Sequence, residues 1–245
     1  MTAKESARNE WAKLKDRPWQ EKAAHLLTYY WGYFAAAIIL IAVVTTFTIN
    51  RLTAKEFALQ GFFAHAVADE AVMNLYEEGF AAVAGIDLNE FDIIIEANSD
   101  SNVDEPELSY NDGELATVRI GSGMTDLFGG DLTAMMTYAY GGYFGDLSQW
   151  ASPEQLEAWE PYLLYMDRAL YEEIARAIDP MAVYALPEPM EPETMQEPFP
   201  FAIMVPADNE VRKAYGFYCT DLAIGIVVNA NHADNAVAFL DYMMR

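Results

Sequence analysis

The longest apolar stretch of the chain lies near its N-terminus. Residues 26–50 contain no charged side chain, and residues 33–44 within them are almost entirely hydrocarbon. A helix needs about 20 mainly apolar residues to cross the hydrocarbon core of a bilayer, so this stretch is long enough. Aromatic side chains, which favour the membrane–water interface, gather at its N-terminal end: Tyr29, Tyr30, Trp31 and Tyr33. The pattern predicts a transmembrane helix over residues 26–50 that contacts membrane lipid.

Two other interpretations of this stretch are weaker. A buried core helix rarely continues for so long without a charged face. A cleaved signal peptide has a shorter apolar region than this one. The sequence Leu52-Thr53-Ala54 also matches poorly the small-x-small pattern of a cleavage site. We therefore expect an uncleaved, single-pass membrane anchor.

The charges on either side of the apolar stretch predict its orientation. Six cationic residues precede it: Lys4, Arg8, Lys13, Lys15, Arg17 and Lys22. Only Arg51 and Lys55 follow it closely. Because cytoplasmic flanks carry the excess of Lys and Arg, we expect the N-terminus in the cytoplasm and the C-terminal domain outside the cell. This divides the chain into a cytoplasmic tail (1–25), a transmembrane helix (26–50) and an extracytoplasmic domain (56–245).

The exported part is strongly acidic. The whole chain carries a formal charge of −24, and four acids among the six cations of the tail leave the tail at +2, so the remainder carries −26. Such a charge repels nucleic acid and anionic lipid surfaces. We therefore expect no nucleic-acid partner, and we interpret the acids as a solvated surface that keeps the domain dispersed.

Apolar patterns after the anchor predict an α/β fold. Residues 57–63 and 91–97 have the apolar, β-branched composition of strands, and residues 69–84 between them have apolar positions at helical spacing. A strand–helix–strand order is typical of two parallel strands joined by a crossover helix. Further strands are predicted over 201–205 and 222–229. Further helices are predicted over 132–140, 152–163, 168–178, 208–215 and 232–244.

The regions between these elements are polar, glycine-rich or ambiguous. Residues 98–112 are predicted to form a polar loop, and residues 186–200 an exposed, acidic connector rich in proline. Glycines at 121–123 and 129–130 predict breaks in the regular structure. Residues 115–120 fit either a helix or a strand.

Three segments resemble known families. Residues 223–243 look like the C-terminal signature of bacterial extracellular solute-binding proteins, a strand ending in Asn followed by a helix with an A-x-x-F-L pattern. Residues 131–155 are similar to a second pattern of that family, with Y-A-x-x-G-x-x-x-D-L matched by residues 138–147. Residues 19–34 resemble the entry segment of single-anchor Firmicutes membrane proteins of unknown role.

The resemblance implies a fold and a function. It implies a small periplasmic-binding-like domain of three layers, α/β in class, with a mixed, mostly parallel sheet. It also implies an extracellular protein that binds a small solute without catalysis. The exported part is shorter than that of type 2 binding proteins, so a reduced form of the two-lobed domain is implied.

A cluster of aromatic residues among glycines is the candidate ligand site. Its members are Tyr138, Tyr140, Tyr143 and Trp150. Aromatic rings in a binding protein can stack on sugars or peptides. Packing of these rings in the core is the alternative interpretation, and the sequence favours it somewhat.

No pattern predicts catalysis or a bound metal. Alternating oxygen-bearing residues in the 98–112 loop leave calcium binding open: Asn98, Asp100, Asn102 and Asp104. The glycine and final glutamate of an EF-hand are absent, so a solvated turn is the preferred interpretation. His25, His65 and His232 lack ligand spacing, and Cys219 in its apolar stretch is expected to be a buried, inert thiol. We expect a non-enzymatic protein with no cofactor and no metal.

Two functions are consistent with these patterns. In the first, the domain captures an extracellular solute. In the second, the cleft is vestigial and the domain is a scaffold that binds another membrane protein. A cavity lined by Tyr140, Tyr143 and Trp150 would favour solute capture, whereas a filled cleft beside an exposed apolar patch would favour the scaffold.

Overall fold

The computed structural model describes residues 18–53, 55–97, 110–177 and 184–245. The chain divides into two compact units, Met1–Ala54 and Lys55–Arg245. The first unit contains one long helix, α2 (Trp19–Thr53). Within it, Trp31–Ile49 is long and apolar enough to cross a membrane, and none of this segment is buried against protein. This length and composition are those of a membrane anchor or a signal sequence.

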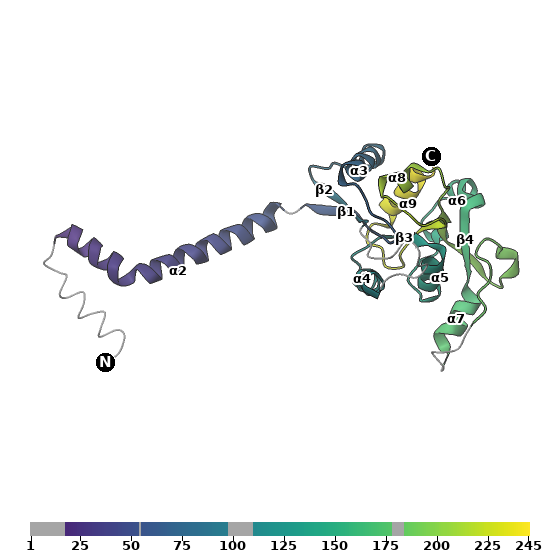
Figure 1. Cartoon of the computed structure of the whole chain (residues 1–245), viewed down its shortest axis with the longest axis horizontal. Helices are drawn as coiled ribbons and strands as arrows, with labels where there is room; N and C mark the ends of the chain where they lie inside the picture. The colour runs from purple at the N-terminus through teal and green to yellow at the C-terminus, as the bar shows by residue number, and fades with distance from the viewer. Residues whose placement is uncertain (1–17, 54, 98–109, 178–183) are drawn as a thin grey trace. The chain divides into compact units, whose positions relative to one another are not determined.

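The second unit is built on a six-stranded mixed sheet with the order β2-β1-β3-β6-β5-β4 (Figure 1). β1 is parallel to both β2 and β3, and the three remaining pairs are antiparallel. The strands are β1 (Glu56–Phe63), β2 (Phe91–Glu96), β3 (Leu127–Asp131), β4 (Leu163–Asp167), β5 (Pro198–Met204) and β6 (Leu222–Ile226). The α-helices are α3 (Glu70–Ala84), α4 (Tyr110–Gly121), α5 (Leu132–Tyr140), α6 (Pro153–Trp159), α7 (Arg168–Arg176), α8 (Glu210–Ala214) and α9 (Ala233–Met243). Three single 3₁₀ turns accompany them: η1 (Leu147–Gln149), η2 (Glu160–Tyr162) and η3 (Pro192–Thr194).

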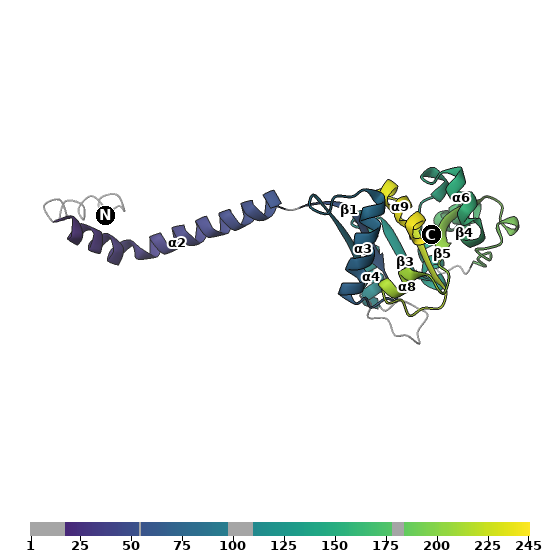
Figure 2. The same cartoon turned by 90° about the horizontal axis from the view of Figure 1, so that it is seen from above.

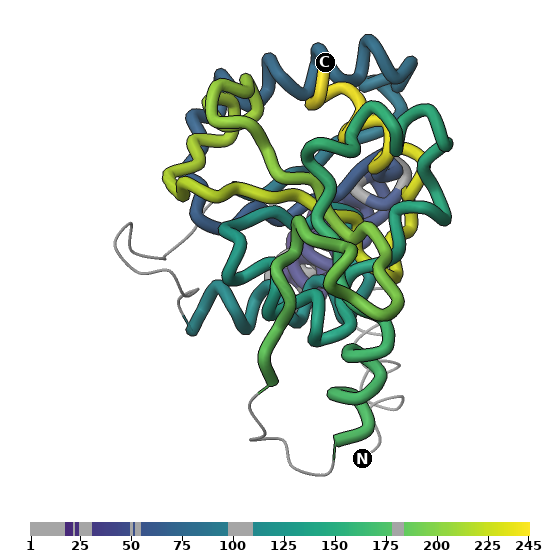
Figure 3. Tube along the Cα trace, turned by 90° about the vertical axis from the view of Figure 1, so that its right-hand side faces the viewer, coloured from purple at the N-terminus to yellow at the C-terminus, as the bar shows by residue number. Residues whose placement is uncertain are grey.

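Helices cover both faces of this sheet. Alternate side chains of one strand point to opposite faces, so Phe63 of β1 packs with α3 and α9 whereas Phe62 packs with α4 and α5. Phe80 of α3 and Phe239 of α9 meet with ring centroids 5.2 Å apart, and Figures 2 and 3 show these two helices side by side, with the C-terminus next to α3. Both faces of the central strands are therefore buried, which explains their continuous apolar sequences.

The predicted α/β class, the mixed sheet and the opening strand–helix–strand unit are confirmed. Asp69 caps the start of α3 by accepting a hydrogen bond from the N–H of Ala71 at 2.9 Å, and Gly85 ends the helix in the left-handed conformation. Parallel pairing is confined to β2, β1 and β3. The mostly parallel sheet implied by the family resemblance thus holds for the first half of the domain only.

The glycine-rich segment before residue 131 was predicted to break the chain, and this prediction was wrong. It forms β3, a central strand between β1 and β6. A Cβ atom at Gly129 would lie 2.9 Å from Phe63 Cδ1 and 3.0 Å from Ile224 Cγ1. The strand needs glycine there because large side chains on both neighbouring strands fill the space above it.

Three other boundaries differ from the sequence predictions. α4 begins at Tyr110, inside the predicted loop, and settles the ambiguous residues 115–120 as helix. The helix predicted over 152–163 ends at Trp159, and its last predicted residue opens strand β4. β5 begins at Pro198, inside the proline-rich connector, because its first residues pair with β4 across a register irregularity that tolerates proline.

Candidate functional site

The carboxyl ends of β1 and β3 form the place where open α/β sheets usually bind ligands, because the chain turns to opposite sides of β1 there. In this protein a loop of the same chain fills that place. Ala66 and Phe217 form an antiparallel bridge, and the N–H of Tyr218 donates a hydrogen bond to the carbonyl of His65 at 3.0 Å. The rings of Phe63 and Phe217 lie 5.2 Å apart. The crevice is therefore closed by main-chain pairing and by aromatic packing.

His65 lies under this closure in a strained conformation. Its φ angle of 54° falls in the left-handed region, and its side chain is almost wholly buried. The ring Nδ1 lies 3.1 Å from Asp131 Oδ2, yet neither ring nitrogen makes a hydrogen bond within the described part of the chain. His65 lies just after β1, and the described residues around it form packed structure and not an open cleft.

The closure gives a direct prediction at Gly216. This residue has a φ of 62°, and a Cβ atom added to it would collide with the carbonyl of Val67. We expect Gly216→Ala to lower the free energy of unfolding by about 1–3 kcal/mol, since both strain and the lost pairing destabilise the fold. Chemical denaturation of the full chain in detergent measures this change. An Ala variant of Gly121, which has open space around its Cβ position, is the control, and equal stability of the two variants would contradict a tight closure.

The tyrosines of the predicted ligand site mostly belong to the core. Tyr138 and Tyr140 are buried. The hydroxyl of Tyr138 donates to the carbonyl of Gly113 at 2.9 Å, and the hydroxyl of Tyr140 accepts from the N–H of Asp167 at 3.2 Å. Tyr143 packs on the same core, with its ring centroid 5.4 Å from that of Tyr138. The hydroxyls of Tyr138 and Tyr140 are hydrogen-bonded within the fold, and the rings of all three tyrosines pack there, as the core interpretation predicts.

Trp150 is the member of the predicted set that lines a cavity. The cavity has a volume of about 160 Å³, and Phe144, Tyr171 and Phe199 also line it. Tyr138, Tyr140 and Tyr143 are not among its lining residues. Pockets that bind drug-sized ligands measure roughly 300–1,000 Å³. This cavity is comparable to one that holds a single small ring.

An ion pair crosses the mouth of this cavity. Arg168 Nη2 lies 2.9 Å from Asp146 Oδ2, and the guanidinium carbon lies 4.4 Å from the ring centroid of Phe199. Asp146 also accepts hydrogen bonds from the main chain and the hydroxyl of Ser148. The pair therefore links the start of α7 to the loop before α6, which is a structural role in its own right.

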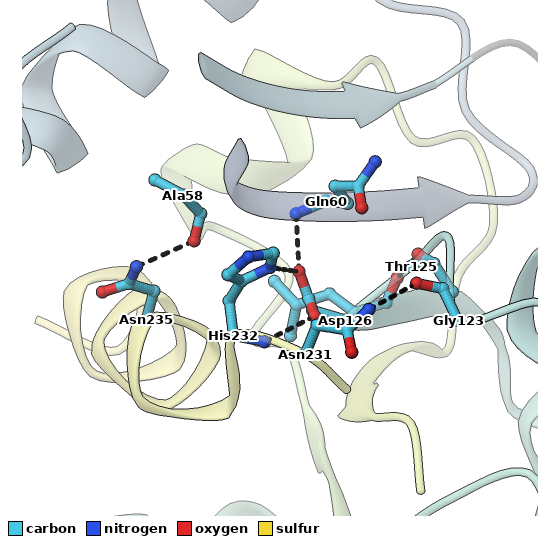
Figure 4. Close-up of polar contacts among 9 residues, drawn as sticks. Ala58, Gln60, Gly123, Thr125, Asp126, Asn231, His232 and Asn235 are labelled. Atoms are coloured by element: carbon cyan, nitrogen blue, oxygen red, sulfur yellow. Dashed lines mark hydrogen bonds and ion pairs between the residues drawn. The ribbon is translucent and has the colours of Figure 1, made fainter. Parts of the chain in front are cut away.

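A second polar cluster surrounds Asp126, at the opposite ends of the parallel strands (Figure 4). One carboxylate oxygen accepts from the N–H of Gln60 at 2.8 Å and lies 2.9 Å from His232 Nδ1. The other accepts from the N–H of His232 at 2.9 Å. The side chain of Asp126 is buried, so this cluster ties β1, β3 and the start of α9 together.

The Asp126–His232 pair resembles the acid–histidine pair of hydrolases in geometry alone. In such enzymes the second ring nitrogen contacts a nucleophile. Within the described residues, His232 makes hydrogen bonds to Asp126 and through its own main chain, and none to a hydroxyl or thiol. Burial raises the pKa of the Cys219 thiol to about 11, so this thiol is neutral at physiological pH and unsuited to nucleophilic attack.

A groove runs along the outer edge of β2, beside the first half of α3. Its volume is about 450 Å³, and it is lined by Ala68, Glu70, Met73, Asn74, Glu77, Ile93, Ile94, Ile95, Glu96 and Ala97. Glu77 is 8% exposed and accepts a hydrogen bond from the Tyr215 hydroxyl at 3.2 Å. Desolvation raises the pKa of Glu77 to about 7, against the opposing effect of that hydrogen bond.

The sequence did not single out Glu77 or Asp126. The available signal for Glu77 is its position on α3. It follows Tyr76 and lies three residues before Phe80, so the helical period places it beside the buried side of the helix. The signal for Asp126 is an acid directly before an apolar pair, Leu127-Phe128. The four residues for which calcium binding was left open, Asn98, Asp100, Asn102 and Asp104, lie outside the described residues. Within the described residues no cluster of three or more His, Cys, Asp or Glu side chains forms a metal site.

Comparisons with protein-family models, with curated proteins and with solved structures find no match to this chain.

Proposed function

We propose that this protein is a single-pass membrane protein whose C-terminal domain lies outside the cytoplasm and binds another membrane protein, without catalysis. The observation that carries the proposal is the closed crevice at the carboxyl ends of β1 and β3. A solute would bind there in an open α/β sheet. The scaffold alternative therefore fits the geometry better than solute capture.

The anchor and its orientation support this location. The 19-residue apolar segment of α2 is not buried against other parts of the protein, as expected for a helix that faces lipid. Six cations precede the apolar stretch and two follow it closely, which favours a cytoplasmic N-terminus. The charge of −26 on the remaining part keeps that part away from anionic headgroups.

An exposed apolar side of α3 is the surface we assign to the partner. Val72, Leu75 and Val83 are 46%, 70% and 53% exposed. They are three, eight and eleven positions apart, which at 3.6 residues per turn keeps them within about 80° of one another around the helix axis. The exposed Ala82 lies beside them and the exposed Glu78 flanks them, so the three side chains form an apolar strip on the outer side of α3. Outer helix faces of monomeric proteins are usually charged, and an apolar one marks an interaction surface.

Site-specific photo-crosslinking in native membranes tests this function. A photoreactive residue placed at Leu75 of the full chain should give a discrete protein adduct, whereas one at the exposed Glu157 of α6 should not. Leu75→Glu should abolish the adduct formed from a photoreactive residue at position 83. It should leave the thermal midpoint unchanged, because Leu75 is exposed. Equal labelling at positions 75 and 157 would overturn the proposal.

Solute capture remains the second candidate because Trp150 lines a cavity with aromatic walls and an arginine. If it is correct, thermal-shift measurements on the full chain with sugars, amino acids and short peptides will show stabilisation by one of them. That stabilisation should disappear in Arg168→Gln. No shift with any of these compounds would exclude solute capture in its simple form.

A further inference from the structure

The groove along β2 has the backbone geometry of a site for an added strand. β2 is the last strand at its end of the sheet, and among the described residues it pairs with β1 alone. Its outer edge therefore carries main-chain N–H and C=O groups without a strand partner. Edge strands of this kind pair readily with an extended segment of another protein.

The side chains that line the groove indicate which residues the added strand should contain. Met73, Ile93 and Ile95 supply apolar surface, and Ile94 at the edge is 39% exposed. Three consecutive isoleucines on an unpaired edge are a liability for aggregation unless something covers them. An occupant with apolar side chains at alternate positions would cover this surface.

The charge of the groove is acidic. Glu96 is paired with Arg119 at 2.7 Å, which leaves Glu70 and Glu77 as the lining carboxylates without a cationic partner in the described residues. They are seven residues apart on α3 and so lie on the same side of the helix, about 10 Å apart along its axis. A basic segment complements this pair of carboxylates.

The segment that follows β2 in the chain is a poor occupant by charge. Residues 98–109 contain four carboxylates and no cation. A second copy of the exported part is disfavoured by the same repulsion, because residues 56–245 carry six cations and 34 acids, a charge of −28. Charge complementarity therefore points to a different protein as the source of the segment.

We propose that the groove between β2 and α3 binds an extended basic segment of the partner protein, which adds to the free edge of β2 and places a Lys or Arg beside Glu77. This inference rests on the proposed function and names the class of partner segment. The main-chain pairing supplies affinity, and the carboxylates supply selectivity for a basic sequence.

The buried carboxyl of Glu77 links this binding to pH. Its pKa of about 7 means that much of it is protonated at pH 6 and ionised at pH 8. A cation beside Glu77 favours the ionised form, so binding releases a proton and becomes tighter as pH rises. The other titratable groups around it are Tyr76 and Glu70 on α3, Tyr215 after α8, Tyr242 on α9, Glu210 on α8 and Glu96 on β2.

Peptide binding to the full chain in detergent tests the inference. The probe is a fluorescent eight-residue peptide of alternating lysine and valine. The controls are a glutamate–valine peptide and a lysine–valine peptide with alternate main-chain nitrogens methylated. We expect the first peptide to bind about tenfold more tightly at pH 8 than at pH 6, and the two controls to bind at least tenfold more weakly. Glu77→Gln should remove the pH dependence, and Glu157→Gln should retain it.

Two results would overturn the inference. The first is no binding of the lysine–valine peptide at either pH. The second is equal binding of the methylated peptide, or an unchanged pH dependence in Glu77→Gln, since either shows attraction by the acidic surface alone. If photo-crosslinking from position 75 still gave adducts alongside either result, the proposed function would hold and only the assignment of the groove as the binding site would be wrong. If those adducts were absent and a solute raised the thermal midpoint, the proposed binding of another membrane protein would itself be wrong.

Discussion

Replacing Asp126 by alanine is expected to lower the free energy of unfolding by about 3–5 kcal/mol. The carboxylate accepts hydrogen bonds from the main chain of Gln60 and His232 and contacts the ring of His232. Alanine would leave two partly buried N–H groups without these acceptors, and a buried group left in this way costs about 1–3 kcal/mol. It would also break the link that the carboxylate makes between the start of α9 and strands β1 and β3.

Chemical denaturation of the full chain in detergent, followed by near-ultraviolet circular dichroism, measures this effect. Asp126→Asn keeps one acceptor oxygen, so we expect a smaller loss of about 1–2 kcal/mol. Asp208→Ala removes an exposed carboxylate and should change stability by less than about 0.5 kcal/mol. If Asp126→Ala behaved like Asp208→Ala, the cluster would not hold these elements together.

Local patterns were sufficient to predict the opening β1–α3–β2 unit of the domain. The strand at β1, the helix at α3 and the strand at β2 each have a period that appears within about ten residues of sequence. The caps of α3 also follow from single residues, Asp69 and Gly85, whose chemistry is local. The apolar stretch in α2 needed only its length and its lack of charge.

Strands β3 and β4, which the sequence did not predict, depend on neighbours that are distant in the sequence. Gly129 looks like a chain break until Phe63 and Ile224, from two other strands, are placed against it. Strand β4 follows directly on a helical segment and pairs with β5, whose first residues are prolines. The sequence gives no local sign of such pairings, because the side chains that require them lie tens of residues away.

The candidate sites depend on distant contacts in the same way. Tyr138 and Tyr140 are close to Trp150 in sequence, yet their rings pack in the core and only Trp150 lines the cavity. Glu77 meets Tyr215 across 138 positions of sequence. Composition could indicate many acids on this chain, but it could not indicate that Glu77 is among the buried ones.

Replacing Glu77 by glutamine is expected to stabilise the protein at pH 8 by about 3 kcal/mol. The pKa of Glu77 rises from 4.5 to about 7 on folding, chiefly through desolvation, and each unit corresponds to about 1.4 kcal/mol. Because the folded state holds the proton more tightly, the native protein loses stability as pH rises from about 4.5 to about 7. Below this window the carboxyl is protonated in both states, and above it the loss is complete.

Glutamine has the shape of the protonated carboxyl and keeps an acceptor for the Tyr215 hydroxyl, so it removes the cost of burying a charge without opening a cavity. The free energies of unfolding of the variant and the native chain should therefore agree at pH 4 and separate progressively up to pH 8. Glu77→Ala is the contrasting variant, because it leaves the buried Tyr215 hydroxyl without its acceptor and should destabilise the protein at pH 4. A difference between Glu77→Gln and the native chain that stays constant with pH would show that folding does not raise the pKa of Glu77, so that it is already ionised between pH 6 and pH 8. The proton release expected on binding a basic segment would then be lost as well, since both effects depend on the same buried, protonated carboxyl.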